Sequence, residues 1–333
     1  MLKSAIEKIL PVFLVNRLIK IKQHATLLKN YIYDKKRYSK YSGTIALDSP
    51  KKLEARLIAS YHVLEKGLSM PDPREGFGKD TALYLIGMLD HYNQKKYDLN
   101  SGQYLSAIQV LDCYIDLQKK YNCNMDDVEA GLAKIRNGAK PTQGGSKEVT
   151  RNELINQSTA NFEKLANSRC SIRNFDNKAV DLDLIKKAIK IAQRTPSVCN
   201  RQSARVYIVK DKINVERISK FQNGNRGFRH LIDKLLIVTS DLQVFEGANE
   251  RYQGFIDGGM FAMSILYALQ YLGLGACALN WAVTRERDEE LRQNVPIKDS
   301  ENVIMFIAVG HLPKTLKVAF SKRRDVDQVI EIL

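Results

Sequence analysis

A segment rich in glycine and proline, from Gly138 to Ser146, divides the chain of 333 residues into two parts of different character. Glycine, proline and small polar residues in succession disfavour both helix and strand. Before this segment, residues 50–136 have helical periodicity throughout, whereas helical and strand-like segments alternate after it. We therefore predict an all-helical N-terminal region over residues 1–137, a linker over 138–150 and a second domain over 151–333.

The composition indicates a folded protein that does not cross a membrane. Hydrophobic residues make up 44% of the chain and charged residues 27%, which excludes wholesale disorder. No run of about 18 uncharged apolar residues is present, so we expect no membrane-spanning helix. The cysteines are scattered without metal-binding spacing, and basic residues interrupt the apolar clusters near the N-terminus. We therefore expect reduced thiols, no bound metal, no secretory signal and a cytoplasmic protein.

Basic residues dominate the sequence, most of all near its N-terminus. The formal net charge is +15, which favours phosphorylated small molecules, nucleic acid or an anionic membrane as partners. Residues 1–22 combine basic and apolar residues at helical spacing, as an amphipathic helix does. Such a helix packs on the rest of a protein more often than it lies on anionic lipid, and peripheral membrane contact stays open as an alternative. No nucleic acid is expected as a partner, because no recognisable module with interleaved aromatic residues is present.

The helical region also carries polar residues that could face a substrate. Its first predicted helix after residue 50 places His62, Glu65 and Lys66 on roughly one surface, and the connector that follows contains Arg74. A solvated charged surface is the more common role of such residues. The histidines of the whole chain form neither a catalytic triad nor a metal-ligand pattern.

The second domain begins with a predicted helix, Asn152 to Asn167, followed by an Arg-x-Ser-x-Arg segment. In an extended conformation, Arg169, Ser171 and Arg173 share one side. Two guanidinium groups and a hydroxyl match the charge and the acceptors of a phosphate. By itself the pattern is weak, because it arises by chance in a basic protein.

Further segments follow in a definite order. A helix capped by Asp181 leads to the segment Thr195-Pro-Ser-Val-Cys-Asn-Arg-Gln202. Asp257-Gly-Gly opens a long apolar helix that stops near Gly273-Leu-Gly275. Strands rich in β-branched residues are predicted at residues 206–209, 235–239 and 303–309.

Taken together, these segments resemble the nitroreductase-like family of FMN-dependent oxidoreductases. The matching pieces are the Arg-x-Ser-x-Arg start, the Pro-Ser-x-x-Asn-x-Gln segment and the Asp-x-Gly-like helix that runs into Gly-Leu-Gly. The strand ending at Val309-Gly310 and the arginines near the C-terminus complete the set, which spans about residues 150–333. The resemblance implies an α+β fold, an α/β/α sandwich with a mostly antiparallel sheet. It further implies a homodimer that binds FMN at its interface.

The resemblance also assigns roles to individual residues. Arg169, Ser171 and Arg173 would meet the phosphate, ribityl chain and pyrimidine edge of FMN, and Arg323 or Arg324 would reach the phosphate from the tail. The other expected cofactor contacts are Pro196, Ser197 and Asn200 from the partner subunit, Gln202, Arg229, and Leu279, Asn280 and Trp281 near flavin N5.

The implied function is electron transfer in which the flavin, and no protein side chain, is the reacting group. NAD(P)H or another donor would reduce FMN, and an organic substrate would take up the electrons. The helical region resembles extensions on some nitroreductase-like proteins from surface-polysaccharide gene clusters, which suggests a substrate linked to polysaccharide biosynthesis. Two features depart from the family: Gln202 is not followed by Pro-Trp, and residues 241–256 are short where relatives build a substrate pocket. The alternative is a non-catalytic, membrane-associated interaction protein whose flavin fold is vestigial.

Overall fold

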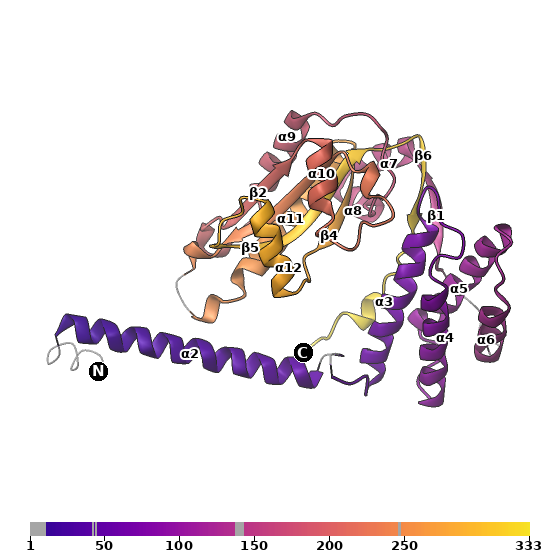
Figure 1. Ribbon diagram of the computed structural model, residues 1–333, viewed down its shortest axis with the longest axis horizontal. Helices are drawn as coiled ribbons and strands as arrows, with labels where there is room; N and C mark the ends of the chain where they lie inside the picture. The colour runs from indigo at the N-terminus through magenta and orange to yellow at the C-terminus, as the bar shows by residue number, and fades with distance from the viewer. Residues whose placement is uncertain (1–10, 42, 44, 137–142, 246–247) are drawn as a thin grey trace.

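A group of helices precedes a mixed domain in the computed structural model, which describes residues 11–333 apart from 42, 44, 137–142 and 246–247 (Figure 1). The predicted segment at residues 1–10 therefore lies outside the described part. The helices of the N-terminal region are α2 (Val12–Tyr41), α3 (Pro50–Leu68), α4 (Lys79–Gln94), α5 (Gly102–Lys120) and α6 (Asp126–Arg136).

Helices α3 to α6 share one apolar core. α3 begins after Ser49, whose side chain accepts a hydrogen bond from the backbone N–H of Lys52 and so satisfies one of the free donors of the first turn. Leu57, Leu85 and Leu111 of three successive helices are fully buried in this core. Burying a leucine side chain stabilises a fold by about 1.5–3 kcal/mol. The predicted helices of residues 50–136 are thus confirmed, together with the periodicity that predicted them.

The second domain alternates short helices and strands. Its α-helices are α7 (Arg151–Ser158), α8 (Phe162–Ser168), α9 (Leu182–Ala192), α10 (Lys212–Ser219), α11 (Gln253–Tyr271) and α12 (Arg285–Asn294). Its strands are β1 (Ser146–Thr150), β2 (Ala204–Val209), β3 (Lys234–Asp241), β4 (Leu274–Asn280), β5 (Glu301–His311) and β6 (Thr315–Ala319). The 3₁₀ turns are η1 (Val198–Asn200), η2 (Arg229–Leu231), η3 (Leu242–Val244), η4 (Ala248–Glu250) and η5 (Val326–Gln328).

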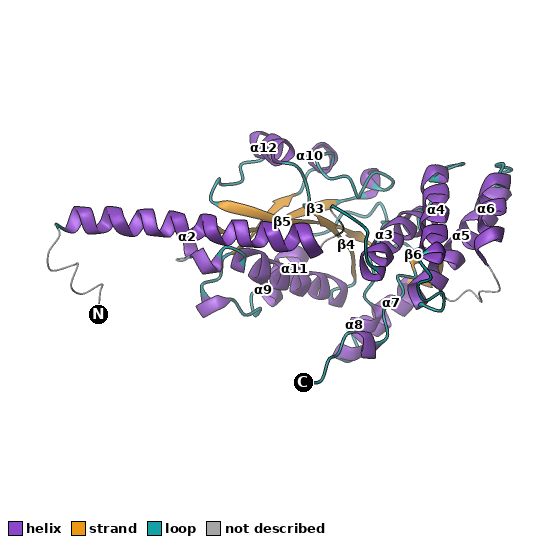
Figure 2. Cartoon of the chain, turned by 90° about the horizontal axis from the view of Figure 1, so that it is seen from below, coloured by secondary structure: helices purple, strands orange, loops and turns teal. Residues whose placement is uncertain are grey.

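An antiparallel sheet in the order β2-β3-β5-β4 forms the middle layer of this domain. Successive side chains of β3 point to opposite faces, as the period of a strand requires. Leu235 and Ile237 enter a core with α10 and α12, whereas Leu236 and Val238 enter a second core with α9 and α11. Helices accordingly cover both faces of the sheet (Figure 2). The predicted α+β fold, an α/β/α sandwich behind a helical region, is confirmed.

A second, two-stranded sheet closes the domain by pairing its two ends. β1 runs antiparallel to β6, with Ser146 opposite Ala319 and Thr150 opposite Thr315. Residues 146–150 belong to the segment that the sequence assigns to a linker, yet they form a strand because β6 supplies partners for their backbone groups. The helix predicted from Asn152 to Asn167 is divided into α7 and α8, since Asn161 caps α8 by accepting the backbone N–H of Lys164.

Helix α2 extends away from the α3–α6 bundle along one side of the mixed domain, where it contacts η4 (Figure 1). Large apolar side chains remain exposed along it, among them Phe13, Leu18 and Leu28. No described helix combines the length and the apolar character needed to cross a membrane.

Candidate active site

A cavity of about 670 Å³ lies between the small β1/β6 sheet, the end of α8 and α11. Arg169, Ser171, Arg173 and Arg323, all predicted as cofactor contacts, line it together. Lys147 of β1 adds a further cation, so that four basic side chains face the cavity together with the carboxylates of Glu148 and Glu153. A basic cavity of this kind attracts an anionic ligand.

The strand-like course of residues 169–173 presents these side chains to the cavity. Arg169 ends α8 with extended backbone angles, φ −63° and ψ 118°. Ile172 then donates its backbone N–H to the carbonyl of Ala276 at 2.9 Å and buries its side chain in the core. With Ile172 fixed inward, its neighbours Ser171 and Arg173 reach the cavity, as alternation along an extended chain predicts, and Cys170 lines it as well.

Arg173 is the most unusual side chain at this cavity. Only 7% of it is exposed, and its Nε and Nη1 atoms are fully buried without a hydrogen-bond partner among the described residues. A buried, unsatisfied donor costs about 1–3 kcal/mol, and more when the group is charged. The arrangement fits a ligand with anionic or acceptor atoms, such as the phosphate or the pyrimidine edge of FMN.

Two thiols accompany Arg173. Cys277 of β4 is buried, and burial raises the pKa of its thiol. Burial likewise raises the pKa of Cys170, which lines the cavity. Both sulfurs are therefore held as neutral thiols near neutral pH and supply no negative charge to the arginines.

The two tail arginines take different directions. Arg323 lines the cavity, and its Nη1 donates to the carbonyl of Ser321 at 2.6 Å. Arg324 turns to the helical region, where its Nη1 lies 2.6 Å from Oε2 of Glu54 in α3. Of the two alternatives, the structure thus brings Arg323 to the cavity and engages Arg324 in a link between the domains.

A second, smaller cavity of about 300 Å³ contains Pro196, Ser197 and Gln202. Thr195, Arg205, Asp257 and Phe261 also line it. Within one chain, the predicted cofactor contacts are thus divided between two separate cavities. Asn200 belongs to the same segment as the residues of the second cavity and has an exposed side chain.

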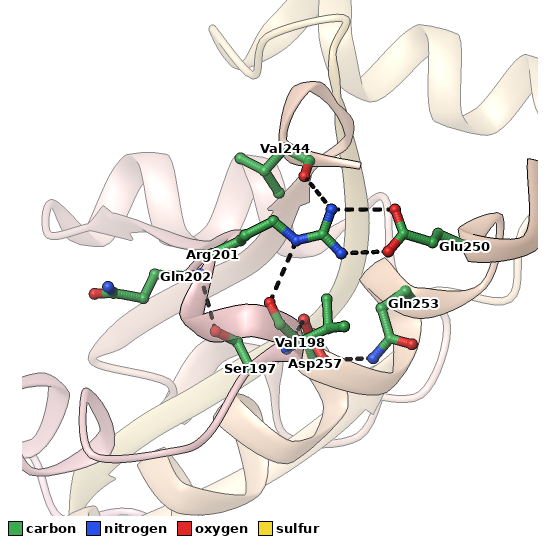
Figure 3. A network of polar contacts seen from close by, with 8 residues as sticks. All are labelled: Ser197, Val198, Arg201, Gln202, Val244, Glu250, Gln253 and Asp257. Atoms are coloured by element: carbon green, nitrogen blue, oxygen red, sulfur yellow. Dashed lines mark hydrogen bonds and ion pairs between the residues drawn. The ribbon is translucent and has the colours of Figure 1, made fainter. Parts of the chain in front are cut away.

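A network of polar contacts braces the segment from Ser197 to Gln202 (Figure 3). The guanidinium of Arg201 forms a bidentate ion pair with Glu250 and also donates to the carbonyls of Val198 at 3.3 Å and Val244 at 2.9 Å. From the other side, Oδ2 of Asp257 accepts the backbone N–H of Val198 at 3.2 Å.

This segment also has a strained backbone. Cys199, Asn200 and Gln202 have φ values of 49°, 54° and 51°. These values lie in the left-handed region that residues other than glycine seldom adopt. Such strain persists only where surrounding contacts impose it, and it gathers at functional sites. The Arg201 network supplies those contacts.

The remaining predicted cofactor residues line neither of these cavities. Arg229 donates to Oδ1 of the buried Asn225 at 3.2 and 3.3 Å. Leu279 is buried in the core, and Trp281 stacks on Phe306 with ring centroids 4.8 Å apart. Asn280 accepts from Nε2 of Gln222 through its backbone carbonyl at 3.2 Å.

The predicted substrate-facing residues are likewise divided. Lys66 lies close enough to Arg173 for the two charges to interact. Glu65 is buried and lies 3.3 Å, through Oε2, from Nδ1 of His62, while its Oε1 has no partner among the described residues. Arg74 is exposed on the connector between α3 and α4.

Sequence reasoning missed Lys147 and the Arg201–Glu250 pair. Lys147 lies in a stretch assigned to the linker, and only the pairing of β1 with β6 brings it to the cavity. Arg201 stands inside a recognised motif, but its partner Glu250 is distant in the sequence and no local pattern connects them. The described residues contain no group of histidine, cysteine or acidic side chains that could hold a metal ion.

Comparison with known proteins gives a family for this domain. The model of the Nitroreductase family matches residues 166–311. No curated protein matches the sequence. The family assignment therefore rests on the family model.

Several solved structures resemble the mixed domain. A nitroreductase-family protein from Streptococcus pneumoniae is 21% identical, covers 52% of this chain and 100% of its own, and has a TM-score of 0.44. A protein described as an NADH oxidase from Clostridium acetobutylicum is 24% identical, with coverages of 50% and 98% and a TM-score of 0.44. An FMN-dependent nitroreductase from Clostridium difficile is 19% identical, with coverages of 44% and 85% and a TM-score of 0.40.

Proposed function

Because residues 166–311 form a nitroreductase-family domain and the protein is thereby a flavin oxidoreductase, we propose that it binds FMN and passes electrons from NAD(P)H to an organic substrate. When bound, FMN supplies the redox chemistry through its ring. The protein side chains bind and orient the reactants, which is what hydride transfer chiefly requires.

The observation that carries this proposal is the buried guanidinium of Arg173. Its unpartnered Nε and Nη1 atoms stand at a cavity that Arg169, Arg323 and Lys147 also line. A dianionic phosphate and the polar edge of a flavin would satisfy these donors through charge-assisted hydrogen bonds. The volume of about 670 Å³ lies within the range of about 300–1,000 Å³ usual for small-molecule sites.

The proposal includes a homodimer in which each chain completes the other's site. Pro196, Ser197 and Gln202 line the second cavity, away from the arginine-lined one of the same chain. Exposed apolar residues on α11, including Phe255 and Ile256, offer a surface for a second copy. Association through this surface would bring the braced segment of the partner toward the arginine-lined cavity.

The net charge of the protein and its helical region suggest the substrate class. A formal net charge of +15 favours an acidic or phosphorylated acceptor. The resemblance of the helical region to extensions on proteins from surface-polysaccharide clusters extends the proposal to a sugar-linked substrate of that kind.

A peripheral membrane contact through α2 is the second candidate function, alone or beside the first. Exposed Phe13, Leu18 and Ile21 alternate there with Arg17 and other basic residues. Basic side chains are attracted to an anionic bilayer, but along α2 the apolar and basic residues are not separated onto opposite faces as the sequence predicts. Cosedimentation with vesicles containing phosphatidylserine, lost on deletion of residues 1–22 without loss of fold, would support it.

The visible absorption spectrum of the purified protein tests the main proposal. We expect flavin bands, retained after removal of free FMN, which bleach when NADH or NADPH is added without air. Flavin bands that persist after addition of both nucleotides would contradict the proposal that NAD(P)H is the electron donor. A protein that stays colourless after incubation with FMN would contradict the proposal as a whole and favour a vestigial fold.

A further inference from the structure

The last turn of α3 connects the helical region to the flavin domain through direct contacts. The carbonyl of Leu68 accepts a hydrogen bond from Oγ of Ser146 in β1 at 3.3 Å. Two residues on, the side chain of Met70 packs against the core of the mixed domain. A Cβ added at Gly227 would come within 2.9 Å of the Met70 sulfur, so the chain passes closely here.

Lys66, in this last turn, lies close enough to Arg173 for the two charges to interact. Burial lowers the pKa of the Lys66 ammonium, and the nearby Arg173 guanidinium lowers it further. The thiol of Cys277 stands close to both cations, and burial keeps it neutral. A lysine from the helical region and an arginine from the flavin domain thus share one partly dry environment.

Neither cation has a counter-charge in the described part of the chain. Arg173 leaves Nε and Nη1 without partners, and the Lys66 ammonium forms no hydrogen bond or ion pair there, although the Lys66 carbonyl accepts from Oγ of Ser69. Glu65, the residue before Lys66, is turned to His62 instead. Two like charges brought together out of water repel each other and lose hydration, which an anion between them would offset.

We propose that Lys66 and Arg173 together form an anion site at the junction of the two domains, with Lys66 as the contribution of the helical region. This inference rests on the proposed function and names the part of the site that the helical region builds. The ligand is a delocalised oxyanion, whose source is either the pyrimidine edge of two-electron-reduced FMN or a carboxylate or phosphate of the substrate. Lys66 is a binding residue that contacts this charge directly.

The test compares Lys66→Met with Lys66→Arg, which keeps the charge, and with Lys119→Met, which removes a cation from a surface pair with Glu129. Acetate is the probe for the apo protein. We expect acetate to raise the thermal midpoint of apo wild type and of Lys66→Arg but not of Lys66→Met. Without acetate, apo Lys66→Met should be at least as stable as wild type, because an unpaired, partly buried charge is removed. If Lys66 only made a stabilising contact within the protein, apo Lys66→Met would be less stable than wild type.

The FMN-loaded protein separates the two sources. If reduced flavin is the anion, Lys66→Met weakens its binding about tenfold relative to oxidised flavin, which lowers the midpoint potential by about 30 mV for a two-electron couple. If the substrate supplies the anion, the potential stays unchanged and the dissociation constant of acetate, read from the flavin spectrum, rises about tenfold.

Two results would overturn the inference: no change in either quantity in Lys66→Met, or the same change in Lys119→Met. Should Lys66→Met fail to fold, Lys66→Gln gives the same comparison. A wild-type protein without FMN would refute the proposed function, while acetate binding to the apo protein would still decide the anion site.

Discussion

Arg173 and Arg201 stand in the same domain, and their surroundings differ in every respect that matters for binding. Arg201 forms a bidentate pair with Glu250 and donates to two carbonyls as well. Arg173 is more deeply buried, yet two of its nitrogens have no partner among the described residues. Arg201 is thus part of the architecture, whereas Arg173 has donors free to pair with a ligand. Because an unsatisfied buried cation lowers stability, the arrangement of Arg173 supports the proposed binding role.

Removing the cations that we propose to bind the FMN phosphate should have the largest effect. We expect Arg169→Ala combined with Arg323→Ala to weaken FMN binding at least about 100-fold, because each charge-assisted hydrogen bond contributes about 1.5–3 kcal/mol. Equilibrium titration of the apo protein with FMN, followed by fluorescence, measures the loss. Arg217→Ala with Arg285→Ala removes two exposed arginines as a control. Undiminished FMN binding in the first variant would place the phosphate elsewhere.

The two cavities also differ in how far the sequence could reveal them. The alternation of Arg169, Ser171 and Arg173 is local, so extended geometry alone predicts a shared side. Leu235 to Val238 likewise predict a strand buried on both faces. The division of the predicted cofactor residues between two cavities, by contrast, depends on tertiary packing, and no local sequence pattern indicates it.

The predicted linker is a second case in which tertiary packing, and not local sequence, decides the structure. Ser146 to Thr150 have no strand signal of their own, and only pairing with β6, far along the chain, makes them a strand. The break between α7 and α8 was readable in principle from Asn161, a favourable capping residue. The helical propensity of the residues on both sides favoured one continuous helix from Asn152 to Asn167, so the break was not predicted.

Breaking the Arg201 pair should lower stability. We expect Arg201→Ala to reduce the free energy of unfolding by about 2 kcal/mol, since it leaves Glu250 without its bidentate partner in a partly buried site. Urea unfolding of the apo protein gives the value, and Arg285→Ala, at a side chain that is 83% exposed, serves as the control. Equal stability of the two variants would show that the network does not brace the segment.

Arg173→Met should change stability in the opposite direction. In the apo protein we expect an increase of about 1 kcal/mol, because two buried unsatisfied donors are replaced by an apolar side chain of similar length. FMN affinity should fall at the same time. The measurement is the same urea titration, with and without saturating FMN. A loss of apo stability like that of Arg201→Ala would remove the distinction between the two arginines.

The smallest effect concerns the strain that the Arg201 network maintains. Cys199 has left-handed backbone angles, φ 49° and ψ 27°, which cost a residue with a Cβ about 1–2 kcal/mol. Glycine avoids this cost but loses about 0.5–1 kcal/mol more in conformational entropy on folding. Cys199→Gly should therefore be more stable than Cys199→Ala by about 0.5 kcal/mol, and the alanine variant isolates the loss of the thiol. If alanine equals or exceeds glycine in urea unfolding, the segment does not hold these angles in solution, and the network around Arg201 does not impose them.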